Sequence, residues 1–483
     1  MLFSTYTFVY FLLLVVLVRW ALPRLVIPWL VLASYVFYLS WDPRYGILLV
    51  SATLGSWLLG LAMVHMPRQR RLWVVLGVVA SLGLLGFFKY AQFALDTAWS
   101  LGLPGSSPVL GIVLPLGISF FTFQALSYVV DVYRGAPAVR SPFAYALYIS
   151  FFPQLIAGPI VRANELVPQL LEWQSFRPAQ FASGVDLLLR GMVKKVVLAD
   201  RFAQVSDLVF GDPTGHGAAM TWLGVVCYAG QIYCDFSAYT DIARGAGRML
   251  GYELPENFRL PYLSKSPAEF WRRWHMTLSR WLRDYLYIPL GGNRRGEARR
   301  MLNLVITMTL GGLWHGASFT FVLWGLLHGV ALLVHRAWVR LTRGSWIEGL
   351  ARREPISASP RPRLVFVALY QALATLATFV FVCFAWVFFR APDFRSALGL
   401  LGQLFRGGGE LLAPEGGLGL VYLALIALGV THLLGLSSRP AALWERWVQR
   451  RAFAPARGLV WALAISACYL LSARPSSFLY FQF

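Results

Sequence analysis

Long apolar stretches separated by short polar segments run along almost the whole chain. Runs of spanning or near-spanning length lie at about 2–18, 25–41, 46–65, 72–88, 109–130, 219–234, 302–334, 364–389, 417–436 and 458–473. The run at 302–334 is long enough for two segments. Since a helix of roughly 20 apolar residues crosses a bilayer core, we predict an all-α polytopic membrane protein with roughly ten to twelve spans.

Several segments between these runs do not fit a span. The apolar runs at 142–160 and 183–199 are short, so we expect tilted or re-entrant helices there. Residues 90–107 are expected to form a short amphipathic or irregular external piece. The basic, proline-containing segment 335–363 is expected to be a cytoplasmic loop or linker. No internal repeat is found, which argues against transporter folds built from inverted repeats.

One membrane domain covering residues 1–483 is expected. We divide it into N-terminal helices, a core, a basic loop and C-terminal helices, at 1–108, 109–340, 341–363 and 364–483. The first apolar run lacks a basic n-region and a small-residue cleavage site, so we expect a retained first span and not a signal peptide. Basic segments follow the first, third and fifth runs and lie at 336–363 and 439–457. If all of them are cytoplasmic, both termini face outside.

Composition agrees with a membrane protein. The chain is 58% hydrophobic and 13% charged, whereas soluble domains carry roughly 25% charged residues. The net charge of +21 falls in loops between apolar runs, so we expect a lipid bilayer around the chain and no nucleic-acid partner. A basic surface that recruits an anionic substrate stays open as a second interpretation. The cysteines are not closely spaced, so neither a disulfide framework nor a metal site is expected.

Histidines inside the apolar pattern are the strongest candidates for chemistry. His315 lies in a glycine-flanked run at 311–317, and His328 follows it. Polar groups at membrane depth are costly unless they are used or satisfied, and a histidine suits proton transfer near neutral pH. A satisfied core histidine is an equally open interpretation for His315 on chemistry alone, and we expect a structural role for His328.

The segment 264–296 is too polar to span and too aromatic for a plain loop. Its apolar and aromatic residues recur at helical spacing, which predicts one helix with Trp271, His275, Leu278 and Leu282 on a single face. Arginines lie off that face and a glycine- and arginine-rich turn follows at 287–296. This arrangement suits phosphate or pyrophosphate binding, or else a surface helix among lipid head groups.

A third polar cluster occupies 228–248, at the end of an apolar run. Asp235 or Asp241 could orient a histidine or line a polar path. For Asp241 we favour a simple ion pair with Arg244 or Arg248.

Many short runs carry a resemblance to a known family. They are 270–279, 281–293, 131–135, 156–162, 194–200, 233–237, 255–258, 312–317 and 480–483. Taken together, and in their order along the chain, these runs resemble the membrane-bound O-acyltransferase (MBOAT) family. The match is closest to its bacterial branch typified by the membrane subunit of alginate O-acetyltransferase. The resemblance implies a ring of tilted helices, with re-entrant and amphipathic helices, around a central tunnel. Ser318 and Phe319 depart from the pattern expected after the 312–317 motif.

The resemblance also implies roles for individual residues. His315 matches the family's catalytic histidine and His275 a second histidine near the tunnel. Candidates for binding the donor's phosphates are Arg272, Arg273, Arg283, Asn293 and Arg294, and candidates for lining or supporting the tunnel are Trp274, Trp314, Asp235, Ser279 and His328.

On this basis we expect a membrane O-acyltransferase in the bacterial inner membrane. It would move an acetyl group from acetyl-CoA or another cytoplasmic thioester for O-acetylation of an exopolysaccharide such as alginate. No permanently bound cofactor is expected. The acceptor is either the polysaccharide or a periplasmic partner of the SGNH-type acetyltransferase class.

Other functions stay open from the sequence. Within the family, the chain could transfer D-alanyl or other acyl groups to teichoic acid or peptidoglycan, or acylate lipids or proteins. From other classes, a polysaccharide-precursor transporter would use Asp131, Asp186, Asp200 and Asp235, and a scaffold of an export complex would tolerate loss of both histidines.

Overall fold

The computed structural model describes an entirely helical chain, with no strand in the part that it describes. The described residues are 3, 5–351, 361–408, 411, 417–434, 454–472 and 478–479. The terminal motif at 480–483 and most of the basic segment 439–457 therefore lie outside them. Contacts divide the chain into two units, one comprising 1–200, 234–256 and 443–483, the other 201–233 and 257–442.

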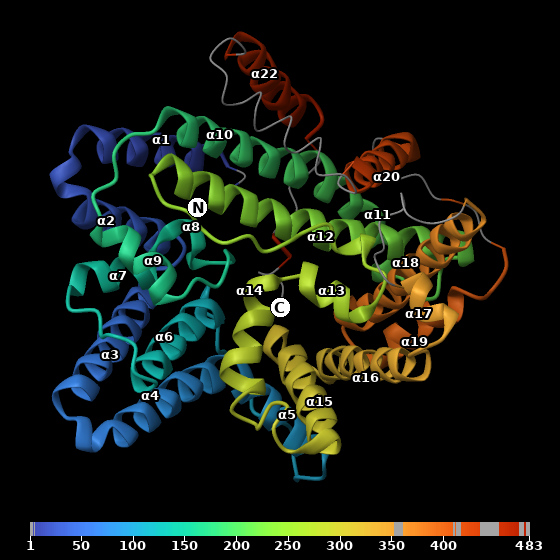
Figure 1. The fold of residues 1–483 in the computed structure, drawn as a ribbon, viewed down its shortest axis with the longest axis horizontal. Coiled ribbons are helices and arrows are strands. Elements are labelled where there is room, and N and C mark those ends of the chain that lie inside the picture. Colours follow the sequence, from blue (N-terminus) through green and yellow to red (C-terminus); the bar gives the residue numbers. More distant parts are fainter. Residues whose placement is uncertain are drawn as a thin grey trace. The chain divides into compact units, whose positions relative to one another are not determined.

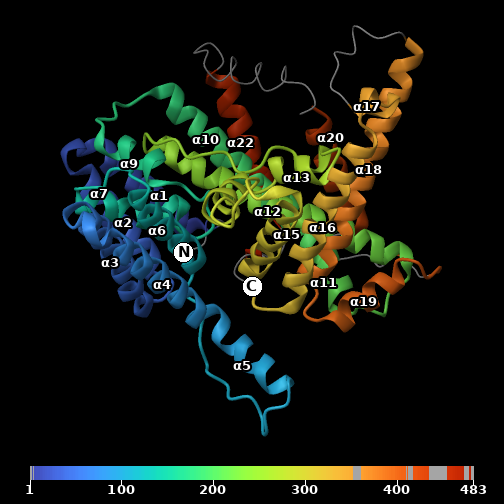
Figure 2. The same cartoon turned by 60° about the horizontal axis from the view of Figure 1, so that its bottom comes forward.

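The first unit begins with the N-terminal helices (Figure 1). Its helices are α1 (Tyr6–Ala21), α2 (Val26–Leu39), α3 (Gly46–His65), α4 (Arg70–Leu85), α5 (Ala91–Ser100), α6 (Ile118–Tyr133), α7 (Pro142–Ser150), α8 (Phe152–Leu155), α9 (Ala163–Leu171), α10 (Pro178–Val193) and α22 (Ala454–Leu470). Helices α3, α4 and α6 contact one another. Figure 2 shows α5 projecting away from these three. Residues 90–100 continue the helix that begins at Pro67, so only the part of 90–107 that follows Ser100 is irregular chain.

The second unit carries most of the candidate chemistry. Its helices are α11 (Asp200–Gly211), α13 (Pro267–Arg273), α14 (Met276–Leu282), α15 (Gly296–His315), α16 (Phe319–Leu341), α17 (Trp346–Ala351), α18 (Arg361–Arg390), α19 (Phe394–Gln403) and α20 (Gly417–Leu434). The long α12 (Ala218–Met249) contributes to both units. The apolar run at 302–334 forms two helices, as predicted. Helix α16 continues to Leu341, so the predicted loop at 335–363 begins later than expected.

Fewer helices qualify as membrane spans than the apolar runs suggest. Among the described residues, five helices are long and apolar enough, and the bent pair α1 and α2 raises this number to six. The five lie at Pro43–His65, Pro67–Ser100, Phe319–Leu341, Val365–Arg390 and Gly417–Leu434. Other predicted spans fold into shorter helices such as α6, with 16 residues. An apolar run therefore marks a buried or tilted helix in this chain as often as a full span.

A buried ion cluster anchors the C-terminal segment within the first unit. The Lys195 ammonium lies in a π-helical turn, η5 (Lys194–Ala199), 2.9 Å from Asp200 Oδ1 and 2.9 Å from Asp235 Oδ1. The Leu479 N–H donates to Asp235 Oδ2 at 2.8 Å. Phe478 and Leu479 are buried. Asp235 therefore joins a helix, a π-turn and the C-terminal segment.

We expect Asp235→Ala to lower the stability of this unit strongly. Removing one partner of a buried ion cluster leaves uncompensated charge and typically costs about 3–5 kcal/mol. Thermal unfolding of the detergent-solubilised protein, followed by tryptophan fluorescence, measures the effect. The matched control is Asp42→Ala, because Asp42 pairs with a highly exposed Arg44 and such pairs contribute about 0–1 kcal/mol. Equal shifts in the two variants would contradict the anchoring role.

Candidate active site

Close packing of α15 against α16 fixes the position of His315. A Cβ atom on Gly325 would meet the Met308 carbonyl oxygen, and one on Gly312 would meet the Phe321 carbonyl oxygen. Only glycine allows two helix backbones to approach this closely. Helix α15 ends at His315. Gly316 has an extended backbone that separates α15 from α16.

His315 sits in an aromatic enclosure. Its side chain is 6% exposed, and its ring centroid lies 4.9 Å from that of Trp314, 5.2 Å from Trp324 and 5.2 Å from Phe389. The walls come from α15, α16 and α18. Rings on several sides limit water around the imidazole, which suits a proton acceptor for a bound substrate.

His275 lies where the helix is interrupted. The predicted single helix through Trp271, His275, Leu278 and Leu282 is therefore wrong. Helix α13 ends at Arg273 and α14 begins at Met276, with His275 between them in the left-handed region at φ 40°. The N–H groups of Met276 and Thr277 donate to the Asn257 carbonyl and Asn257 Oδ1, at 2.9 and 3.1 Å. These bonds replace the helical ones, so the helix stops here.

The two histidines belong to one site. Their ring centroids are 6.5 Å apart, and Trp314 contacts both rings. His275 is fully buried, and burial lowers its pKa to about 3. Its Nδ1 lies 3.2 Å from Asn257 Oδ1. His275 is therefore neutral at physiological pH, because burial would strip an imidazolium of its hydration.

The predicted supporting residues surround this pair in part. Trp274 is 2% exposed and packs against Phe270 and Trp386, while Ser279 Oγ donates to the Trp274 carbonyl oxygen at 3.4 Å. His328 is fully buried, and its Nδ1 accepts a hydrogen bond from Trp271 Nε1 at 3.3 Å. Because His328 stacks on Phe270 and contacts Trp324, it shapes the aromatic wall one layer behind His315.

The carboxylates of the 228–248 cluster have other partners. Asp235 belongs to the ion cluster with Lys195 in the first unit. Asp241 pairs with Lys194 at 2.8 Å, whereas an arginine partner was predicted. Sequence separation explains this error, because Lys194 lies on η5, far from Asp241 along the chain.

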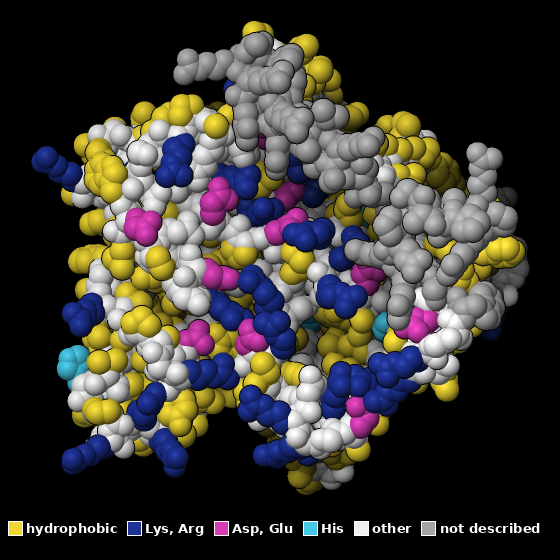
Figure 3. Space-filling model, viewed as in Figure 1, with side chains coloured by type: hydrophobic (Ala, Val, Ile, Leu, Met, Phe, Trp, Pro, Cys, Tyr) yellow, Lys and Arg dark blue, Asp and Glu magenta, His cyan; other side chains and the backbone are white. Residues whose placement is uncertain are grey.

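A large cavity opens among α13, α16 and α18. Its volume is about 1350 Å³. Part of its lining is apolar surface of α16 and α18, and the charged and titratable residues in it are Arg259, Lys265, Glu269, Arg272, Arg273, His335 and Glu348. Figure 3 shows Lys and Arg side chains gathered over α13 and α16. An elongated ligand with anionic and apolar parts fits this lining.

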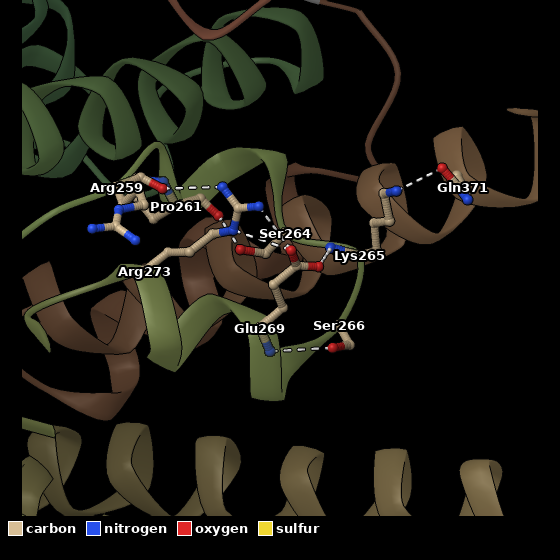
Figure 4. A network of polar contacts seen from close by, with 8 residues as sticks. All are labelled: Arg259, Pro261, Ser264, Lys265, Ser266, Glu269, Arg273 and Gln371. Atoms are coloured by element: carbon tan, nitrogen blue, oxygen red, sulfur yellow. Dashed lines mark hydrogen bonds and ion pairs between the residues drawn. The ribbon is translucent and has the colours of Figure 1, made fainter. Parts of the chain in front are cut away.

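Hydrogen bonds hold the basic side of the cavity in place (Figure 4). The Glu269 carboxylate accepts bonds from Arg273, at 2.8 and 3.1 Å, and from the Lys265 backbone N–H at 3.0 Å. Arg273 also donates to the Arg259 carbonyl oxygen at 3.2 Å, and Lys265 Nζ donates to Gln371 at 2.5 Å. Arg273 and Lys265 are thus held in place before any ligand enters, which lowers the entropy cost of binding.

Only two of the five predicted phosphate-binding residues reach this cavity. Arg272 and Arg273 line it. Arg283 pairs with the adjacent Asp284 at 2.6 Å and is 61% exposed, Asn293 accepts a hydrogen bond from Tyr287 at 2.6 Å, and Arg294 is exposed. These three residues follow α14 in the sequence, after the interruption of the helix at His275.

Residues that the sequence analysis missed complete the site. Trp324 and Phe389 enclose His315, and Asn257 contacts His275. The run at 255–258 marked Asn257 as part of a motif, but no spacing rule links it to a histidine 18 residues later. Phe389 lies on α18, whose apolar pattern is that of an ordinary span.

Comparison with known proteins places these features in a wider group. The model of the MBOAT, membrane-bound O-acyltransferase family matches residues 118–379, which include both histidines. "Probable alginate O-acetylase AlgI" of Pseudomonas putida is 36% identical over 94% of each chain. "Peptidoglycan O-acetyltransferase" of Helicobacter pylori is 40% identical over 77% of this chain and 72% of its own. "Teichoic acid D-alanyltransferase" of Bacillus subtilis is 26% identical over 60% of this chain and 71% of its own.

Proposed function

Because this chain belongs to the membrane-bound O-acyltransferase family, we propose that it transfers an acetyl group from acetyl-CoA to a hydroxyl group in the O-acetylation of an exopolysaccharide such as alginate. The observation that carries this proposal is the enclosed pair of His315 and His275, together with a cavity that has basic and apolar lining residues. The relative named an alginate O-acetylase, which aligns over 94% of this chain, supports the choice of acceptor.

His315 is the general base in this proposal. Its imidazole takes the proton of the acceptor hydroxyl while that oxygen attacks the thioester carbonyl carbon. The tetrahedral intermediate collapses, the C–S bond breaks, and the CoA thiolate leaves with the proton returned by His315. A positioned base contributes roughly 10²–10⁴-fold to the rate, and the alignment of two substrates in one enclosed site contributes the remainder.

His275 assists at the same site, either by polarising the thioester carbonyl or by orienting the acceptor. Both roles require a ring close to His315, and the 6.5 Å separation of the rings is compatible with both. Trp274, Trp314 and His328 support the two histidines by packing.

The cavity among α13, α16 and α18 is the proposed donor site. Arg272 and Lys265 would bind the phosphates of CoA, while Arg273 keeps the wall in shape through Glu269. We expect Arg272→Ala to raise the KM for acetyl-CoA roughly tenfold, the equivalent of one charge-assisted hydrogen bond. The matched control is Arg283→Ala, which removes an exposed arginine paired with Asp284. If the KM rises equally in both variants, or in neither, the cavity among α13, α16 and α18 is not the donor site.

The bacterial inner membrane is the proposed location, with both termini outside. The acetyl group passes either to the polysaccharide directly or first to a periplasmic partner of the SGNH-type acetyltransferase class. The test is ester analysis of a strain that lacks this chain, in which we expect O-acetyl groups to vanish from the secreted polysaccharide. Loss from peptidoglycan instead would favour the acceptor of the Helicobacter pylori relative, and loss of D-alanine esters would favour teichoic acid.

A further inference from the structure

Asn257 holds His275 through an amide oxygen that is already fixed by other bonds. Its side chain is fully buried. Oδ1 accepts the Thr277 backbone N–H at 3.1 Å and the Thr277 hydroxyl at 2.9 Å, and His275 Nδ1 lies 3.2 Å from the same atom. We propose that Asn257 is a positioning residue that keeps the proton of His275 on Nδ1, so that Nε2 presents a hydrogen-bond acceptor to the hydroxyl-bearing substrate. This inference rests on the proposed function.

The direction of the bond between Asn257 and His275 follows from the Thr277 backbone. A backbone N–H can only donate, so the amide atom that it contacts must be the oxygen and not the nitrogen. An amide oxygen can only accept, so His275 Nδ1 must carry a proton. In a neutral imidazole the other nitrogen, Nε2, then holds a lone pair.

Burial keeps His275 in this neutral form. Burial lowers the pKa of His275 to about 3, because it disfavours the charged imidazolium. The titratable group that faces its ring is His315 of α15. The ring also packs against Phe258 and Trp314, which do not titrate.

The two histidine rings are too far apart for a direct hydrogen bond. A direct hydrogen bond brings two imidazole centroids to within about 5.5 Å, since each nitrogen lies about 1.1 Å from its centroid and the bond spans at most about 3.2 Å. The observed 6.5 Å is longer, so the two rings do not hydrogen-bond to each other and each can serve a different polar group of the substrate.

This tautomer selects one of the two roles proposed for His275. A lone pair on Nε2 cannot donate to a carbonyl oxygen, so His275 does not polarise the thioester. The proton of the reacting hydroxyl goes to His315, so Nε2 of His275 receives a hydrogen bond from a second O–H or N–H of the acceptor. The neighbouring hydroxyl of a sugar ring is such a donor. Asn257 thereby contributes to acceptor recognition without touching the acceptor.

Two substitutions at Asn257 separate the tautomer from the fold. Asn257→Asp keeps an oxygen at the position of Oδ1, and Asn257→Leu removes it. We expect polysaccharide O-acetylation at pH 8 to fall at least tenfold in Asn257→Leu and less than threefold in Asn257→Asp, at equal membrane levels of protein. Wild-type acetylation in Asn257→Leu would overturn the proposal, as would equal loss in both variants.

The pH profile of Asn257→Asp gives a readout that a structural role would not change. A carboxylate at this position stabilises the imidazolium and raises the pKa of His275. Protonated His275 has no lone pair on Nε2, so activity in this variant falls as pH falls through the raised pKa. The wild type has its His275 pKa near 3 and lacks this inflection between pH 5.5 and 8.5. Identical profiles would overturn the proposal.

Ring ¹⁵N chemical shifts read the tautomer without any transfer reaction. The probe is ¹⁵N-histidine-labelled protein in proteoliposomes, with His275 identified by comparison with His275→Asn, because asparagine tolerates the left-handed backbone. We expect an unprotonated Nε2 in the wild type and a mixture of tautomers in Asn257→Leu. A protonated Nε2 in the wild type would overturn the proposal. If the shifts agree but the host polysaccharide carries no acetyl groups, the proposed function fails and the tautomer assignment stands.

Discussion

Replacing His315 with alanine is expected to reduce polysaccharide O-acetylation to the level of a strain without the protein. The variant loses the proton acceptor for the attacking hydroxyl, and the rate falls roughly 10²–10⁴-fold. The His315 ring packs against Trp314, Trp324 and Phe389, so its loss also leaves a cavity. Colorimetric ester analysis of secreted polysaccharide, normalised to membrane protein level, measures the effect.

Two controls make this result specific to the base. His315→Gln retains a polar side chain of similar size but cannot accept and return a proton, so it should be as inactive as the alanine variant at normal protein levels. His65→Ala removes an exposed histidine on α3 and should leave acetylation unchanged. Substantial acetylation in His315→Gln would transfer the role of base to another group, with His275 the first to test.

The second large effect is expected from Gly325→Val at the contact of α16 with α15. A Cβ atom at this position would meet the Met308 carbonyl oxygen and lie 3.0 Å from Thr309 Cα. Backbone atoms cannot rotate away, so the helices must separate. Forcing extra atoms into a packed interface costs about 1–3 kcal/mol, and more when the backbone has to move. We therefore expect a lower midpoint of thermal unfolding and loss of acetyl transfer, because α15 carries His315.

Gly83→Ala is the matched control for this interface. A Cβ atom there meets no atom within 4 Å, and alanine favours a helix over glycine by up to about 1 kcal/mol. Its unfolding midpoint should stay the same or rise slightly. If Gly325→Val unfolds at the wild-type temperature, the close approach of α15 and α16 does not hold in the membrane.

The pattern of apolar residues predicted the features that depend on nearby residues in the sequence, such as the helices. Apolar period and length identified the helices, and the length of the run at 302–334 correctly predicted two segments there. Among the described residues five or six helices qualify as spans by length and composition, fewer than the apolar runs, because hydropathy does not separate a helix buried in protein from one in lipid. Hydropathy alone did not identify the two histidines as a pair. The family resemblance marked both rings as candidates.

Contacts between distant segments could not be predicted. Asn257 captures the N–H groups of the chain after α13 and thereby ends the helix, although the sequence of 264–282 alone favours one continuous helix. In the same way, Lys194 and Lys195 pair with Asp241 and Asp235 across more than 35 residues. Arg272 and Arg283 were both candidates for binding the donor's phosphates. The interruption of the helix at His275 leaves Arg283 outside the cavity that Arg272 lines.

Transfer of labelled acetyl groups across the membrane tests the central claim most directly. Inverted inner-membrane vesicles would be prepared from the native host, with the chromosomal copy replaced by the wild type or by His315→Gln. Acetyl-CoA labelled in the acetyl group would be added to the cytoplasmic face that these vesicles expose. We predict label in the polysaccharide fraction for the wild type and none above background for His315→Gln. Equal labelling in both, or none in the wild type, would contradict a His315-dependent membrane O-acetyltransferase.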